Sequence, residues 1–266
     1  MTTLSLADAI PRSIPRAAFV SGGARRLGRA TALTLARAGF SVAIHYRSSA
    51  AEAEALAAEI RALGVEAALV AGDLAAEAET QGLIARATDA LGPIGVLVNN
   101  ASTFERDAWQ GVTRATWDHH LGPNLRAPFV LTQSFARALP TTAEGVVINM
   151  LDPRVWALSE HLVSYTLSKS ALWTLTQSLA LALAPRIRVN GIGPGPTLPS
   201  THETAEQFAQ DARILPLGHS TNPEEIGRAV LAILALPSLT GQMLALDGGQ
   251  HLMRRTLGLD DASASA

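Results

Sequence analysis

The 266-residue chain contains no cysteine, so it can form no disulfide and supply no thiolate as a metal ligand or a nucleophile. The chain also has no large excess of charge of one sign, because its 21 Lys and Arg residues nearly balance its 23 Asp and Glu residues. Nucleic acids and anionic membrane surfaces attract proteins with a basic field. We therefore expect neither of them as a partner.

Long apolar runs are absent as well. No stretch of eighteen apolar residues occurs, which argues against a transmembrane helix. The N-terminal segment carries Asp8, Pro11 and Pro15 without a continuous apolar core, so it does not have the pattern of a secretory signal peptide. The expected location is the cytoplasm.

Short apolar runs alternate with helix-like stretches along the chain, and 48% of the residues are hydrophobic. The expected strands are 17–20, 41–46, 66–70, 96–98, 146–150, 187–192 and 243–246. The expected helices are 27–39, 50–63, 77–91, 113–139, 162–184 and 223–236. Apolar strands that are each followed by a helix predict an α/β fold, a single Rossmann-type domain whose doubly wound, parallel, seven-stranded sheet has helices on both faces.

The domain organisation follows from this alternation. Residues 16–254 are expected to form the domain, with a flexible lead-in at 1–15 and a flexible tail at 255–266. Residues 193–222 interrupt the alternation and are rich in Gly, Pro, Thr and Ser, which is typical of a binding loop. A short helix is expected near 205–212, and Pro123 and Pro128 are expected to kink or break the helix at 113–139.

A glycine-rich turn follows the first strand, with the sequence Ser21-Gly22-Gly23-Ala24-Arg25-Arg26-Leu27-Gly28. Glycines allow a tight turn, and the N-terminus of the next helix attracts a pyrophosphate. Such a turn is often only a packing feature, but here it opens an α/β chain, as a dinucleotide site does. We expect Asp73 and Leu74 near the adenine, and Asn100, Ala101 and Ser102 near the nicotinamide.

The second strand ends at His45-Tyr46-Arg47-Ser48, where an enzyme that uses NAD usually has a carboxylate for the ribose 2′-hydroxyl. No carboxylate is present. Arg47, Ser48 and His45, with Arg26, would instead hold the 2′-phosphate of NADPH. Alternatively, Arg47 is a solvated residue at a strand end.

Asp152, Tyr165 and Lys169 form the most informative group. Tyr165 and Lys169 lie four residues apart, so a helix places them on one face. Asp152 directly follows the apolar strand 146–150, and a carboxyl group near these side chains suits proton transfer. The alternative for Asp152, which precedes Pro153, is a turn in which the carboxylate caps its own backbone.

Together these motifs resemble the short-chain dehydrogenase/reductase family. The resemblance includes Asn124 in the long helix, Tyr165-Thr166-Leu167-Ser168-Lys169, Pro194-Gly195 and Asp247-Gly248-Gly249. It implies that Tyr165 protonates the substrate, that Lys169 favours the tyrosinate and holds the ribose, and that Asn124 anchors a water. It also implies a homotetramer, and we expect further cofactor contacts from Met150, Pro194, Gly195 and Thr197.

Within the family, the chain resembles the pteridine reductases. The resemblance lies in Arg26 of the glycine turn, in His45–Ser48, in Asn100-Ala101-Ser102-Thr103-Phe104, and in Asp152 at the usual serine position. It implies that Asp152 and Tyr165 deliver a proton, that Phe104 stacks on the pterin, and that Arg26 and Ser102 contact its edge. Phe104 could alternatively be a core residue, and Pro196 and Thr197 replace the usual leucine and serine.

Three functions remain open at this stage. The first is NADPH-dependent reduction of dihydropterins such as dihydrobiopterin or dihydromonapterin, and of dihydrofolate in addition. The second is reduction of a ketone or imine. The third is a sensor that binds NADPH without catalysis, which the intact Tyr165, Lys169 and Asn124 disfavour.

Overall fold

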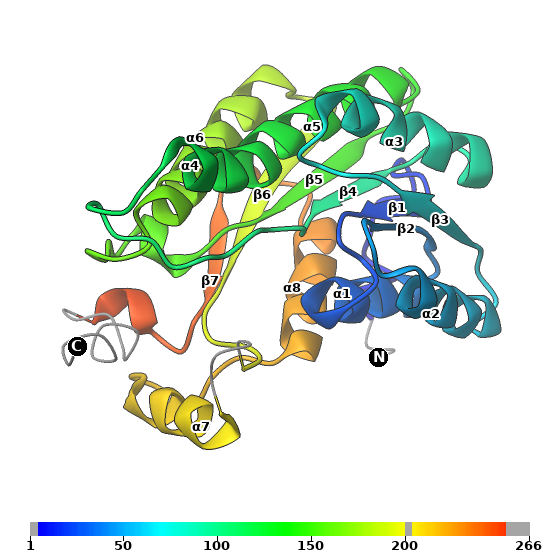
Figure 1. Ribbon diagram of the computed structural model, residues 1–266. Coiled ribbons are helices and arrows are strands. Elements are labelled where there is room, and N and C mark those ends of the chain that lie inside the picture. The colour runs from blue at the N-terminus through cyan, green and yellow to red at the C-terminus, as the bar shows by residue number, and fades with distance from the viewer. Residues whose placement is uncertain (1–4, 200–203, 254–266) are drawn as a thin grey trace.

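The computed structural model describes residues 5–199 and 204–253. Seven strands form one parallel sheet in the order β3-β2-β1-β4-β5-β6-β7, which confirms the predicted fold class (Figure 1). The strands are β1 (Ala17–Val20), β2 (Ser41–Tyr46), β3 (Ala67–Ala71), β4 (Val96–Asn99), β5 (Gly145–Met150), β6 (Ile187–Pro194) and β7 (Met243–Leu246). Each of them coincides with a predicted run to within two residues.

Helices cover both faces of the sheet. One face carries α1 (Arg26–Arg37), α2 (Ala50–Ala62) and α8 (Pro223–Ala235), and α3 (Glu77–Leu91), α4 (Arg114–Leu121), α5 (Ala127–Ala138) and α6 (Val163–Ala182) lie on the other (Figure 1). Two separate clusters of buried apolar residues fill the space between the sheet and these two layers. The strands are nearly continuous apolar runs because both of their faces are buried.

The predicted long helix at 113–139 is interrupted, as its prolines indicated. A π-helical turn at Gly122–Arg126 separates α4 from α5 and contains Pro123. Proline has no backbone N–H and cannot take part in regular i→i−4 bonding. The turn buries Asn124 in the interior, at 0% exposure.

The lead-in is a correction to the prediction. Ile10 and Ile14 are each 2% exposed and belong to the core, so the part of the lead-in from Ile10 onward is packed on the domain instead of flexible. Arg16 reinforces this by donating a hydrogen bond to the carbonyl of Ile10 (3.2 Å). Residues 1–4 and the predicted tail at 255–266 lie outside the described residues.

The loop after β6 contains α7 (Ala205–Ile214), close to the predicted short helix. Residues 200–203 of this loop lie outside the described part. Within the described ranges, no helix is long and apolar enough to cross a membrane.

The strand order reverses between β1 and β4, which are neighbours in the sheet although β2 and β3 lie between them in sequence. In parallel α/β sheets, ligands bind outside the carboxyl ends of the strands at such a reversal. The glycine turn after β1, the segment after β4 and Asp152 after β5 all meet at this edge. The topology therefore brings the predicted motifs together.

Candidate active site

The glycine turn is shaped for close approach of another group to its backbone. Gly22 has a φ of +60°, which favours glycine, and a Cβ on Gly28 would lie 2.1 Å from the carbonyl oxygen of Gly22. The hydroxyl of Ser21 fixes the neighbouring segment by accepting hydrogen bonds from the backbone N–H groups of Asn100 and Ala101, each with a length of 2.9 Å. The turn and the end of β4 thus form one rigid unit.

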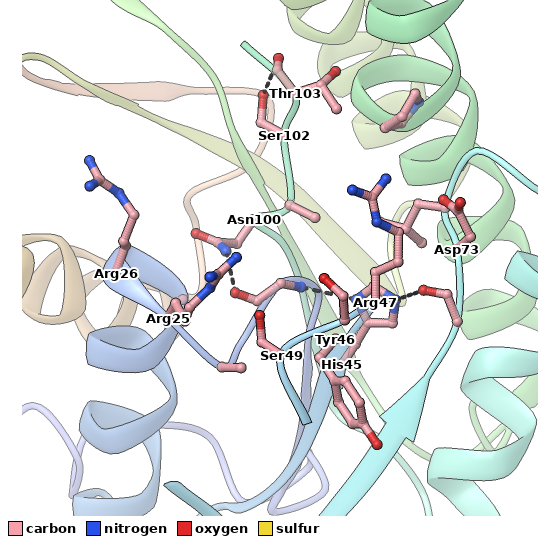
Figure 2. Close-up of a pocket in the computed structure, with 18 of the residues that line it drawn as sticks. Arg25, Arg26, His45, Tyr46, Arg47, Ser49, Asp73, Asn100, Ser102 and Thr103 are labelled. Atoms are coloured by element: carbon pink, nitrogen blue, oxygen red, sulfur yellow. Dashed lines mark hydrogen bonds between the residues drawn. The ribbon is translucent and has the colours of Figure 1, made fainter. Parts of the chain in front are cut away.

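A cavity of about 380 Å³ opens in front of this turn (Figure 2). Arg25 and Arg26 approach it from the glycine turn and Arg47 from the end of β2. Its lining includes most of the predicted cofactor residues, namely Gly22, Arg26, Leu27, Gly28, His45, Tyr46, Arg47, Ser48, Asp73, Leu74, Asn100, Ala101 and Ser102. The glycine cradle and the three arginines fit the phosphates of a dinucleotide. Arg25 was not among the predicted cofactor residues, although it precedes Arg26 in the glycine-rich motif.

His45 does not have the predicted role of phosphate ligand. Its side chain is 2% exposed, and both of its ring nitrogens are occupied. Nδ1 accepts the N–H of Gly22 (3.0 Å), so Nε2 carries the proton and donates to the carbonyl of Gly72 (3.1 Å). Burial lowers the pKa of His45 to about 4, so the ring is neutral near pH 7 and offers a phosphate no charge. His45 instead fixes the glycine turn to the end of β3.

Arg26 lies between the two cavities of the site and connects the glycine turn to the loop after β6. Its guanidinium donates hydrogen bonds to the carbonyls of Pro199 (3.1 Å) and Leu198 (3.3 Å). Its φ of +52° is unusual for a residue other than glycine and costs about 1 kcal/mol. Strain of this kind persists where other contacts hold the residue in place.

A second cavity of about 300 Å³ adjoins the first and contains the predicted chemistry. The predicted residues that line it are Arg26, Leu27, Asn100, Ser102, Phe104, Met150, Asp152, Tyr165, Lys169, Pro194, Gly195 and Thr197. Arg106, Arg154, Phe208 and Gln250 line it too, and sequence reasoning missed all four. Only Arg154 had a usable signal, because it follows Asp152 by two residues.

Asp152 and Tyr165 are in direct contact. The Tyr165 hydroxyl donates to Oδ2 of Asp152 over 3.0 Å, and the two residues are only 7% and 6% exposed. Arg154 donates to both carboxylate oxygens through Nη1 (3.2 and 3.1 Å). Oδ1 also accepts the N–H of Arg154 (2.8 Å) and caps a short 3₁₀ turn, so Asp152 is a turn cap as well as part of the site.

The pKa of Tyr165 is not lowered toward neutrality, contrary to the effect that the family resemblance implies for Lys169. Burial, and secondly the charge of Asp152, raise the pKa of Tyr165 well above its usual range. Tyr165 is therefore a phenol that holds its proton. Lys169 donates to the carbonyl of Met150 (2.8 Å), and burial lowers its pKa to about 8.

Asn124 bonds to the segment after β4. Its Oδ1 accepts the N–H of Thr103 (2.8 Å), and its Nδ2 donates to the carbonyl of Thr103 (3.0 Å) and to the hydroxyl of Ser168 (3.1 Å). These bonds connect the Phe104 segment to α6 next to Lys169. The predicted role of Asn124 in anchoring a water near Lys169 remains a prediction.

Phe104 is not a core residue. Its side chain is 41% exposed at the cavity, and its ring meets Tyr165 edge-on with centroids 4.8 Å apart. An exposed aromatic ring beside a polar pair suits a flat, heteroaromatic ligand. The core alternative for Phe104 is therefore wrong.

Comparison with known proteins agrees with this geometry. The family model described as "short chain dehydrogenase" matches residues 16–211, most of the chain. The chain belongs to the short-chain dehydrogenase family. It is an oxidoreductase with the Rossmann-type fold of that family.

Individual relatives differ in the activities for which they are named. FolM alternative dihydrofolate reductase 1 from Brucella canis, solved with NADP, is 46% identical with a TM-score of 0.88, over 93% of this chain and 98% of that one. A blue fluorescent protein from a metagenomic library, solved with NADPH, is 32% identical with a TM-score of 0.81, over 90% and 99%. The 3-oxoacyl-[acyl-carrier-protein] reductase FabG of Staphylococcus aureus (strain Mu50) is 28% identical over 89% of this chain and 98% of its own length.

Proposed function

We propose that this short-chain dehydrogenase reduces pteridines with NADPH, converting dihydropterins, and dihydrofolate in addition, to their tetrahydro forms. The proposal rests mainly on the hydrogen bond between Tyr165 and Asp152 (3.0 Å), with Arg154 on the same carboxylate (3.1 Å). The similarity to a FolM protein at 46% identity supports it.

The carboxyl group of Asp152 favours a substrate that is reduced at a ring C=N bond over one that is reduced at a ketone. Arg154 pairs with the carboxylate of Asp152 over 3.1 Å at the second cavity. A carboxylate beside a ketone oxygen would repel the alkoxide that forms during reduction. The amino-pyrimidinone edge of a pterin instead presents N–H groups, which a carboxylate can accept.

Proton transfer is assigned to Tyr165. Reduction of a C=N bond requires a hydride at carbon and a proton at nitrogen, and NADPH supplies the hydride when it is bound. Tyr165 carries the proton, because its raised pKa keeps it protonated at neutral pH. Although the pKa of Tyr165 is raised overall, the positive charge of Arg154 acts in the opposite direction and stabilises the phenolate that the transfer leaves. Solvent then returns the proton to Tyr165.

The remaining residues bind and orient. Arg25, Arg26 and Arg47 line the first cavity and would hold the phosphates of NADPH. Lys169, beside the Met150 carbonyl, would hold the ribose hydroxyls. Phe104 would stack on the pterin ring, since its half-exposed ring lines the second cavity. We also propose a homotetramer, from the family resemblance alone, and a cytoplasmic location, from the sequence patterns described above.

Carbonyl reduction is the second candidate, because the chain also resembles the S. aureus FabG. An absorbance assay of NADPH oxidation distinguishes the two candidates. Dihydrobiopterin, dihydromonapterin and dihydrofolate are compared with a 3-oxoacyl thioester and simple ketones. We expect turnover of the pteridines, and turnover of the ketones alone would contradict the proposal. Tight NADPH binding without any turnover would indicate a sensor.

A further inference from the structure

We propose that His120 is a positioning residue that holds Phe104 against Tyr165. His120 lies on α4, does not line either cavity, and is 0% exposed. It acts on the Phe104 loop, which we define as residues 102–107. Its effect on substrate rests on the proposed function, but its anchoring of the loop does not.

The two neighbours of Phe104 are both fixed through their backbones. Asn124 holds the N–H and the carbonyl of Thr103, and Nε2 of His120 accepts the N–H of Glu105 over 3.0 Å. His120 and Asn124 are four residues apart, so both reach the loop from one side of the α4 segment. Hydrogen bonds thus fix the backbone on both sides of Phe104.

The ring of His120 is held in one tautomer. Because Nε2 accepts a backbone N–H, the proton resides on Nδ1, which donates to the Ser164 hydroxyl (2.7 Å). Ser164 in turn donates to the carboxylate of Asp107, which also accepts the Ser164 N–H (3.1 Å). This directed chain begins and ends on the Phe104 loop and passes through α6 one residue before Tyr165.

Burial supports the same assignment of protons. It lowers the pKa of His120, with His119 acting in the same direction and Asp107 and Glu105 in the opposite one. A neutral ring keeps Nε2 available as an acceptor. A protonated ring would place a donor against the Glu105 N–H, and the anchor would be lost.

Phe104 depends on the anchoring of its neighbours because its own side chain is only partly packed. Its side chain is 41% exposed, so burial alone does not hold it in place. Its ring contacts Tyr165 at 4.8 Å, and the ring of His120 contacts Tyr165 at 5.9 Å. His120 therefore supports both the loop and the tyrosine that the loop faces.

Hydrogen exchange followed by mass spectrometry tests the anchor without any substrate. His120→Phe keeps an aromatic ring and removes both hydrogen bonds. We expect amides of residues 102–107 to exchange about tenfold faster, whereas those of the glycine turn stay unchanged. His119→Phe is the matched control, because the His119 side chain pairs with the Glu105 carboxylate (3.3 Å) and lies edge-on to the His120 ring, whereas the bond to the Glu105 N–H comes from His120. The carbonyl of His119 holds Thr103 in either variant. Unchanged exchange in the His120 variant would overturn the proposal.

Steady-state kinetics tests the consequence for Phe104. We expect His120→Phe to raise KM for dihydrobiopterin about tenfold with little change in kcat or in NADPH affinity. In a Phe104→Ala background, the same substitution should have no further effect. Additive effects would mean that His120 does not act through Phe104.

Two further variants keep the test decisive. His120→Gln retains an acceptor near the position of Nε2 and should restore part of the protection of the loop. If His120→Phe does not fold, Ser164→Ala removes the partner of Nδ1 together with the hydroxyl bond to Asp107. This variant should still raise the exchange rate of residues 102–107, and no rise would overturn the proposal. A wild-type enzyme that reduces no pterin would contradict the proposed function, and the exchange measurement would still decide the role of His120.

Discussion

Tyr165 donates its hydroxyl proton to a carboxylate, Asp152, that already receives two hydrogen bonds from the guanidinium of Arg154. Asp152 follows β5, and Tyr165 lies in the first turn of α6. The pair therefore joins the end of a strand to the start of a helix at the edge where the cavities open. The proposed preference for a pterin rests on this carboxylate and on its contact with Arg154.

Asp152→Ser restores the residue that most of the family has at this position. We expect kcat/KM for dihydropterins to fall by about 10²-fold or more, because the substituted site loses its carboxylate and its proton donor loses a partner. The dissociation constant for NADPH should stay unchanged. Asp118→Ser is a matched control, since Asp118 is exposed on α4 and pairs with Arg114. Unchanged pterin turnover in Asp152→Ser would remove Asp152 from the mechanism.

Arg47→Glu should shift the cofactor preference toward NADH. Arg47 is exposed at the first cavity, where a carboxylate would repel a 2′-phosphate and could accept a ribose hydroxyl. We expect the ratio of NADPH to NADH affinity, measured by fluorescence titration, to fall about tenfold or more. Arg228→Glu makes the same charge change on the exposed side of α8, outside both cavities. Equal ratios in the two variants would rule out contact between Arg47 and the phosphate.

His45 should make the fold sensitive to acid. Its pKa is about 4 in the folded protein against 6.5 ordinarily, so the unfolded chain binds a proton that the folded chain does not between these values. The free energy of unfolding should then fall as the pH drops below 6.5, by about 3 kcal/mol on reaching pH 4. Urea unfolding at several pH values measures this slope. His45→Asn, which does not titrate, should show a smaller slope, and an equal slope would assign the acid sensitivity to other groups.

Gly227 of α8 lies at the contact between α8 and α1, against Thr34. A Cβ on Gly227 would lie 2.3 Å from the Thr34 hydroxyl oxygen, so Gly227→Ala should lower the free energy of unfolding by about 1–3 kcal/mol. Gly82→Ala is the matched control, because Gly82 is exposed within α3 and a Cβ there meets nothing within 4 Å. That variant should gain about 0.5–1 kcal/mol from helix propensity. Thermal unfolding of both proteins gives the two signs, and a gain for both would contradict the proposed packing.

The sequence was sufficient for features that depend on local spacing. Seven apolar runs predicted the seven strands, and the four-residue interval between Tyr165 and Lys169 placed both on the buried side of α6. The prolines at 123 and 128 predicted the interruption between α4 and α5. Such patterns survive folding because they reflect the periods of helices and strands themselves.

Predictions about individual side chains failed where burial decided the outcome. His45 was expected to bind a phosphate, but its ring is buried and forms two hydrogen bonds with the backbone. Ile10 and Ile14 were assigned to a loose segment, although each is buried against residues far away in the sequence. Lys169 was expected to favour the tyrosinate, but burial and the charge of Asp152 raise the pKa of Tyr165.

By itself, the sequence determined the fold class, the order of the motifs and the presence of a carboxyl group where the family usually has a serine. Only the tertiary structure decided that Arg154 holds this carboxylate, that Tyr165 keeps its proton, and that His120 fixes the loop of Phe104. The reason is physical. Spacing along the chain sets the secondary structure, but charge, desolvation and hydrogen-bond partners depend on residues that only folding brings together.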